Sequence, residues 1–255
     1  MDKALYVAMT GARASLQAQG TVSHNLANVD TKGFKAALAG TEAFKIQGQG
    51  FPSRVDAVLI DPGFDGRTGS QMVTGRSLDI SLQPNRWLAV QAADGGTAYT
   101  RNGELSVTPN GQLVTAGGRA VLDDNGNPIA VPPAQSIDVG ADGTVSIIPQ
   151  GEGPQTMAVV GRMRIVEAAQ SQLARGGDGL MRPSDPQAPA LAPVTGNSLT
   201  VGVLEGSNVD AAGALDKPGA VGDQSLLAEI DLAIFLHGRA EPAESAPADH
   251  QHGHQ

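Results

Sequence analysis

Residues 1–35 read MDKALYVAMTGARASLQAQGTVSHNLANVDTKGFK, and this stretch decides how the rest of the sequence is interpreted. Apolar or small residues recur in it at alternating intervals of four and three, the spacing of one seam along an α-helix, although the seam is polar at Gln19 and Ser23. A helix with a single apolar seam needs a partner that covers it. We therefore predict an assembly interface, of coiled-coil type, made of Leu5, Met9, Ala12, Leu16 and Leu26.

The predicted helix runs into a polar turn, residues 25–35, with the sequence NLANVDTKGFK. Side chains such as Asn28 and Asp30 can bond nearby backbone and stop a helix, and Gly33 can adopt a positive φ. Phe34 is expected to anchor the chain where it leaves the turn.

This turn resembles the signature of flagellar axial proteins, the rod, hook and hook-associated family, which is written N-x-A-N-x-x-T-x-G-F-K. The matching positions are Asn25, Ala27, Asn28, Thr31, Gly33, Phe34 and Lys35. A capped amphipathic helix of an unrelated soluble protein is the alternative, but it does not account for seven matches at fixed offsets.

The composition argues against several kinds of partner and site. The net charge is −9 and no basic run exists, which argues against nucleic acid or an anionic membrane surface as a partner. Cysteine is absent, so neither a disulfide framework nor a thiolate metal site is expected. No apolar stretch approaches the roughly 18 residues of a membrane-spanning helix, and no signal-peptide pattern is found. We expect no membrane insertion.

From Ser77 the apolar pattern changes to a period of two, with Leu78, Ile80 and Leu82 alternating with polar residues. Asn102-Gly103 predicts a hairpin between strands at 98–101 and 104–108. The longest strand is expected at 157–166, residues 167–197 are expected to be loop, and a last strand is expected at 198–204. Many short strands with polar turns predict an antiparallel β-sandwich or open barrel, so the fold class is mainly β with a long N-terminal α-helix.

Two further stretches resemble the same axial family. The block from Ser77 to Leu122 is similar to its central β-domain, and residues 204–210, LEGSNVD, are similar to the segment that opens its C-terminal helix. Asn208 or Ser207 is therefore expected to cap that helix. Where the family has a Gly-containing turn this chain has Asn85, which is expected to tolerate the turn conformation. Within the family, the proximal-rod members are the most similar.

These signals divide the chain into four segments. They are an axial helix with its signature turn at 1–34, an extended connector at 35–76, a β-rich domain at 77–204 and a C-terminal segment at 205–255. The last is expected to hold a short helix at about 224–237 and a disordered tail. The resemblance stops after Leu215, through either divergence or a shifted reading frame, so we expect an incomplete helical pair and impaired rod function.

We find no residues arranged for catalysis, so no catalytic, cofactor-binding or metal-binding residues are assigned. Phosphate-binding loops, a nucleophile elbow and a paired acid and base are missing from the sequence. Residues 123–127, DDNGN, lack the glycine and closing glutamate of a calcium loop and are interpreted as a turn. His24 is expected to be a surface or interface residue, and the His-rich tail a solvated one.

Taken together, the sequence predicts a structural subunit of the flagellar basal-body proximal rod. The alternatives are another axial protein, of the distal rod or hook, and an unrelated exported β-sandwich binding module. The resemblance implies other rod subunits, homo- or hetero-assembled, and the flagellar type III export apparatus as partners. It also implies a place in the rod across the periplasm, reached without a cleaved signal peptide.

Overall fold

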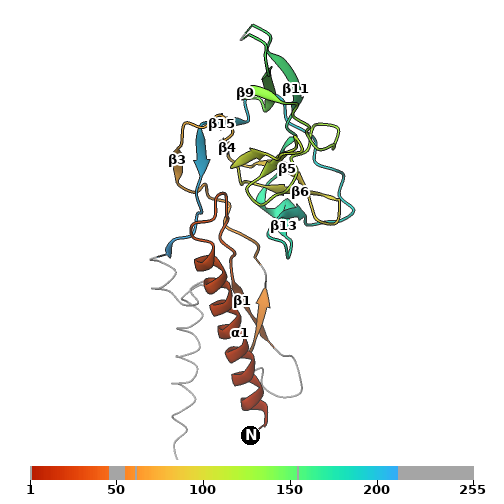
Figure 1. Ribbon diagram of the computed structural model, residues 1–255. Coiled ribbons are helices and arrows are strands. Elements are labelled where there is room, and N and C mark those ends of the chain that lie inside the picture. The colour runs from red at the N-terminus through yellow and green to blue at the C-terminus, as the bar shows by residue number, and fades with distance from the viewer. Residues whose placement is uncertain (1, 46–54, 61, 154, 212–255) are drawn as a thin grey trace, which may run out of the picture. The chain divides into compact units, whose positions relative to one another are not determined.

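The computed structural model describes residues 2–45, 55–60, 62–153 and 155–211, and the backbone alone for 2–8, 43–45 and 55–59. The chain begins with one long helix, α1 (Asp2–Ala27), and continues into strands (Figure 1). The expected helix at 224–237, the tail and the divergence after Leu215 all lie outside the described residues. Within those residues no helix is both long and apolar enough to cross a membrane.

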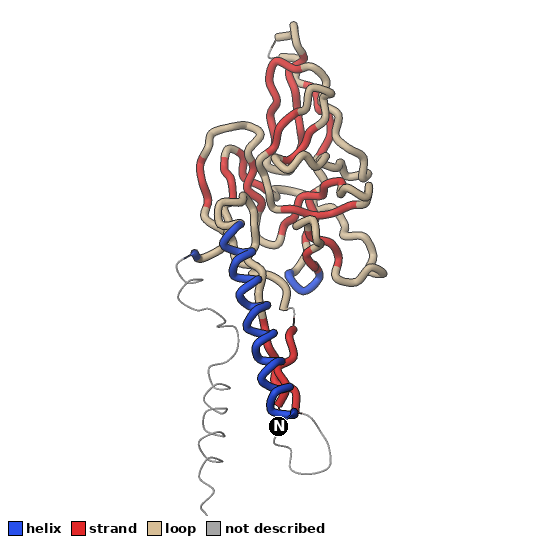
Figure 2. Tube along the Cα trace, turned by 60° about the horizontal axis from the view of Figure 1, so that its bottom comes forward, coloured by secondary structure: helices blue, strands red, loops and turns tan. Residues whose placement is uncertain are grey.

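Helix α1 packs beside an antiparallel pair of strands, β1 (Gly40–Lys45) and β2 (Val55–Ile60) (Figures 1 and 2). The side chain of Ala14 is buried, and those of Ala18 and Val22 are half-buried, on the same side of the helix. Small side chains on this face let the backbone of α1 approach the strand pair β1-β2 closely. The segment at 35–76, predicted as an extended connector, contains the paired strands β1 and β2.

All strand pairs in the described chain are antiparallel, and the described sheets do not close into a barrel. One sheet has the order β12-β5-β6-β14-β13 and another the order β11-β10-β9. Three two-stranded ladders, β3-β16, β4-β15 and β7-β8, complete the pairing. The predicted fold class is confirmed. The bounds are β3 (Gln71–Val73), β4 (Ile80–Leu82), β5 (Arg86–Gln91), β6 (Thr97–Thr100), β7 (Leu105–Val107), β8 (Leu113–Thr115), β9 (Ala134–Val139), β10 (Thr144–Pro149), β11 (Ala158–Arg162), β12 (Ile165–Glu167), β13 (Leu173–Arg175), β14 (Met181–Pro183), β15 (Leu199–Val201) and β16 (Val203–Glu205), with a 3₁₀ turn η1 (Gln170–Gln172).

Two apolar clusters form the core of the β-rich part. The larger one gathers aliphatic side chains such as Leu82, Leu88 and Leu105. The smaller one is aromatic and includes Phe64 of the connector, whose ring meets Trp87 edge-on at 5.6 Å between centroids. Phe64 is 1% exposed, so the connector is anchored in the β-domain core.

The hairpin predicted at Asn102-Gly103 is wrong. β6 pairs with β5 and β14, while β7 pairs with β8. Gly103 does not adopt a positive φ. It lies so close to Ile80 that a Cβ atom would overlap the Ile80 carbonyl oxygen. The glycine therefore serves a close approach between backbones, which the local pattern does not distinguish from a turn.

Three other strand predictions are corrected. The strand expected at 157–166 is divided between β11 and β12, which belong to different sheets. The last strand is divided at Gly202, which has φ +74. The stretch 167–197 contains the paired strands β13 and β14. The first two corrections involve a change of partner strand or a bend that periodicity along the chain does not record, and the third is a local hairpin of two short strands.

Candidate functional site

The predicted assembly seam lies on the face of α1 that points away from its own strands. Met9 is 49% exposed, Leu16 is 68% exposed and Leu26 is 39% exposed. Ala12 is also exposed, and the side chain of Leu5 lies outside the described residues. At about 100° of rotation per residue, Leu16 points roughly 160° away from the buried Ala14. The small-residue face of the helix therefore packs against the subunit's own strands. Its larger apolar side chains are not covered by any other described part of the chain.

The signature turn folds the chain back against the end of α1. The Asn28 side chain donates to the His24 carbonyl at 2.9 Å, and the Thr31 hydroxyl donates to Asn28 Oδ1 at 3.1 Å. The Asn25 amide both donates to and accepts from the backbone of Ala37, at 2.8 Å each way. These bonds explain why two asparagines and a threonine recur at fixed offsets. Ala27 is exposed.

Gly33 lies directly against the β-domain backbone. Its φ is +68, as predicted. Its N–H donates to the Glu205 carbonyl at 2.8 Å. A Cβ atom here would come within 2.6 Å of the Asn102 nitrogen and would overlap the Arg101 carbonyl. Glycine is therefore required at this position for two reasons: the positive φ and the lack of room for a Cβ atom.

Phe34 and Lys35, at the end of the turn, attach it to Arg175 of β13. The Arg175 guanidinium lies 4.4 Å from the centroid of the Phe34 ring, a cation–π contact. Arg175 also donates to the Lys35 carbonyl. The half-buried Phe34 thus anchors the turn as predicted, and the His24 ring lies 5.7 Å from it.

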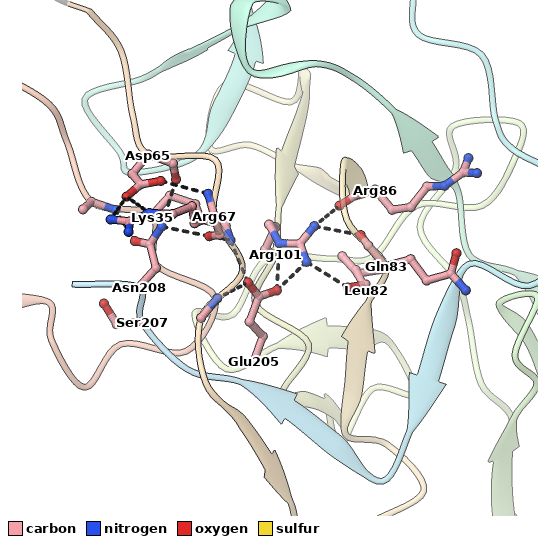
Figure 3. A network of polar contacts seen from close by, with 12 residues as sticks. Lys35, Asp65, Arg67, Leu82, Gln83, Arg86, Arg101, Glu205, Ser207 and Asn208 are labelled. Atoms are coloured by element: carbon pink, nitrogen blue, oxygen red, sulfur yellow. Dashed lines mark hydrogen bonds and ion pairs between the residues drawn. The ribbon is translucent and has the colours of Figure 1, made fainter. Parts of the chain in front are cut away.

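Lys35 belongs to a buried ion triad with Arg101 and Glu205 (Figure 3). Lys35 Nζ lies 2.7 Å from Glu205 Oε1, and Arg101 Nη2 lies 2.5 Å from Glu205 Oε2. The exposed fraction of these side chains is 2% for Lys35 and Arg101 and 0% for Glu205. The Gly69 N–H also donates to Glu205 Oε1, at 3.0 Å. One carboxylate thus receives bonds from three separate parts of the chain.

Arg101 uses all five of its donors. Nε and one Nη2 hydrogen bond reach Glu205, and the other bond of Nη2 reaches the Leu82 carbonyl at 2.8 Å. Nη1 donates to the carbonyls of Gln83 and Arg86, at 3.0 and 2.7 Å. A guanidinium bonded in this way is held in a single orientation. Arg101 therefore presents its charge to Glu205 at a fixed place in the β-domain.

Burial alone would raise the pKa of Glu205. The charges and hydrogen bonds of Arg101 and Lys35 outweigh that effect and hold the pKa of Glu205 below its ordinary value of 4.5. Glu205 is therefore ionised at neutral pH. Its role is structural: the carboxylate is the shared ion-pair partner of the buried Lys35 and Arg101.

Asn208 completes the junction. Its side chain accepts from the Ala36 N–H at 2.6 Å and donates to the carbonyls of Asp65 and Arg67, both at 2.9 Å. The side chain of Asn208 therefore holds the connector, and the helix that Asn208 or Ser207 was predicted to cap lies outside the described residues. Ser207 accepts from the Val209 N–H at 3.2 Å.

Residues 5–35 match the family model described as flagella basal body rod protein, and residues 82–147 match the flagellar hook protein FlgE/F/G D1 domain. The flagellar basal-body rod protein FlgF of Escherichia coli K12 is 42% identical over 219 residues, which is 84% of this chain and 86% of the relative. The chain belongs to the FlgF family of flagellar basal-body rod proteins. It is a structural subunit of the rod.

Other relatives agree with this assignment. FlgF of Caulobacter vibrioides is 34% identical over 215 residues, 82% of this chain and 83% of the relative. The rod protein FlgG of Bacillus subtilis is 32% identical over 238 residues, 82% of this chain and 86% of the relative. These relatives are named as rod proteins, and the alternatives of a hook protein or an unrelated binding module are not favoured.

The two matched regions meet at the ion triad, since Lys35 ends the first and Arg101 lies within the second. The sequence prediction found the signature residues but missed that Glu205 and Asn208 bind them and that Arg101 in turn holds Glu205. One usable signal was present: Arg101 directly follows β6 and Glu205 is the last residue of β16, and a charged side chain beside core-forming residues is unusual unless it is paired. Within the described residues, no group of three His, Asp or Glu side chains could hold a metal ion.

Proposed function

We propose that this FlgF-family rod subunit assembles through the exposed seam of α1. The observation that carries the proposal is the division of the helix into two faces, with Ala14 buried against its own chain and Leu16 68% exposed on the opposite side. Removing large apolar side chains from water is favourable, so an exposed apolar seam is stabilised when another surface covers it. Neighbouring rod subunits, of the same or another kind, supply that surface.

The family membership supports the finer parts of the proposal. The subunit resides in the rod of the basal body where it crosses the periplasm. It reaches that place through the flagellar export apparatus without a cleaved signal peptide. It performs no catalysis and binds no nucleic acid. Its signature turn, Asn25 to Lys35, serves to fix the end of the assembling helix to the β-domain.

Leu16→Asp tests the proposal. It places a charge in the middle of the seam, and we expect loss of the subunit from isolated basal bodies and loss of motility. The cooperative melting of the β-domain should not change, because Leu16 contacts none of its core. Gln17→Asp is the matched control: it adds the same charge one residue along, about 100° from the seam, and should assemble normally.

Two results would count against the seam. Normal incorporation of the Leu16→Asp chain would show that Leu16 faces no neighbour. A large fall in its melting temperature would show instead that the seam stabilises the subunit itself.

A further inference from the structure

The last extended stretch of the described chain is divided by one glycine into two strands with different partners. β15 pairs with β4, and β16 pairs with β3. Gly202, between them, has φ +74, and Gly75 on the facing chain has φ +73. The N–H groups of Thr74 and Gly75 both donate to the Gly202 carbonyl, at 2.8 and 3.1 Å. Glycine permits large changes of backbone direction at low cost, so both chains can pivot at this crossing.

Residues 203–208, called the clasp, are bonded to the signature segment, and Leu204 and Glu205 within them are buried. The Gly33 N–H donates to the Glu205 carbonyl at 2.8 Å, and the Ala36 N–H donates to Asn208 Oδ1 at 2.6 Å. The clasp pairs with β3, whose three residues are all exposed. The apolar burial of the β3-β16 ladder is therefore limited to Leu204 of β16, which is 6% exposed.

The charge of Glu205 adds a second source of stability to the burial of Leu204. Glu205 is the anion shared by Lys35 and Arg101, which come from the signature segment and from the β-domain. If the clasp moved away, two buried cations would remain near each other without their counter-ion. That arrangement is strongly unfavourable, so the clasp and its two partners are held together as a unit.

We propose that residues 203–208 form a clasp that opens and closes about Gly202, and that the negative charge of Glu205 holds it closed on Lys35 and Arg101. When the clasp is closed, the end of α1 is fixed to the β-domain. When it is open, the signature segment is released while β15 stays paired with β4. The clasp therefore couples whatever follows residue 208 to the exit of the assembling helix.

Native-state hydrogen exchange of the full chain tests the proposal. In Glu205→Gln, exchange of the amides in 33–36 and 203–208 should rise together, at least tenfold. Exchange in β5, residues 86–91, should not change, because β5 belongs to the β-domain core. Combining Lys35→Gln with Glu205→Gln should add less than the two single changes predict, since both act through one pair. The matched control is Glu167→Gln, which neutralises a carboxylate that is 61% exposed and paired with Arg86 at 3.0 Å.

The pH profile separates charge from shape. The charged groups around Glu205 are Lys35 and Arg101, with Asp65 and Arg67 beyond Lys35. Because the folded-state pKa of Glu205 lies below 4.5, its contribution is complete above that value and is lost as the pH falls through the folded-state pKa. Exchange at 33–36, measured relative to β5, should therefore rise in acid for the natural chain. In Glu205→Gln the ratio should be high and independent of pH.

Three outcomes would overturn the clasp. The first is unchanged exchange at 33–36 in Glu205→Gln. The second is a rise in β5 as large as that at 33–36, which would make Glu205 a residue of general stability. The third is a pH profile of Glu205→Gln that matches the natural chain.

Discussion

Gly33 lies in the left-handed region and against the backbone of Arg101 and Asn102. The first condition alone would accept asparagine, which tolerates a positive φ better than other side chains do. The second condition excludes every Cβ atom, since the neighbours that it would meet are backbone and cannot rotate away. The positive φ alone would make Gly33→Val more harmful than Gly33→Asn, but the contact with the Arg101 and Asn102 backbone affects both substitutions.

We predict that Gly33→Asn destabilises the junction about as much as Gly33→Val does. Both should cost roughly 1–3 kcal/mol, the range for forcing extra volume into a packed site. Gly118→Asn is the matched control, because Gly118 has φ +72 and nothing within 4 Å of an added Cβ. Thermal melting of the three variants measures the difference. If Gly33→Asn melts like Gly118→Asn, the contact with the Arg101 backbone is unimportant.

At the scale of elements, sequence and structure agree for features that local sequence determines. They differ for features that distant contacts determine. The extent of α1, the positive φ of Gly33 and the left-handed Asn85, at φ 58, follow from periodicity and turn chemistry. The ion triad does not, because Lys35 and Glu205 are 170 residues apart. The strong local signal at Asn102-Gly103 failed since the close approach of Ile80 decides the conformation there.

Phe64 shows how an element is misassigned when its contacts are distant. It lies in the predicted connector, yet its ring is buried among side chains of β5, β6, β12, β13 and β14, including Trp87, Tyr99 and Val166. An isolated phenylalanine between glycines gives no strand or helix pattern. Its burial indicates that the β-domain depends on residues before 77, where the sequence placed its start.

We predict that Phe64→Ala lowers the free energy of unfolding of the β-domain by about 3–5 kcal/mol, the cost of emptying an aromatic core site. Val73→Ala serves as the control, because Val73 is 86% exposed and its truncation should stay within about 0.5 kcal/mol. Urea denaturation followed by Trp87 fluorescence measures both. A cost below about 1 kcal/mol for Phe64→Ala would mean that the connector is not part of the β-domain core.

At the scale of the whole molecule, the two ends of the β-domain meet at one place. Residues 33–36 and 205–208 are bonded to each other, so the exit of α1 and the residues that follow β16 are held at one junction. This arrangement suits a rod subunit, because it fixes the end of α1, the helix proposed to contact neighbours, to the β-domain. The seam of α1 is the part of that surface with the largest exposed apolar side chains on the helix.

The central claim, that the seam of α1 contacts a neighbouring subunit, is tested most directly by crosslinking in assembled basal bodies. A photoreactive amino acid is placed at position 16, on the seam, or at position 14, on the face buried against the same chain. Position 16 should give a product joining two rod subunits, and position 14 should give only products within one chain. The absence of any product between subunits from position 16, in rods that have assembled normally, would contradict it.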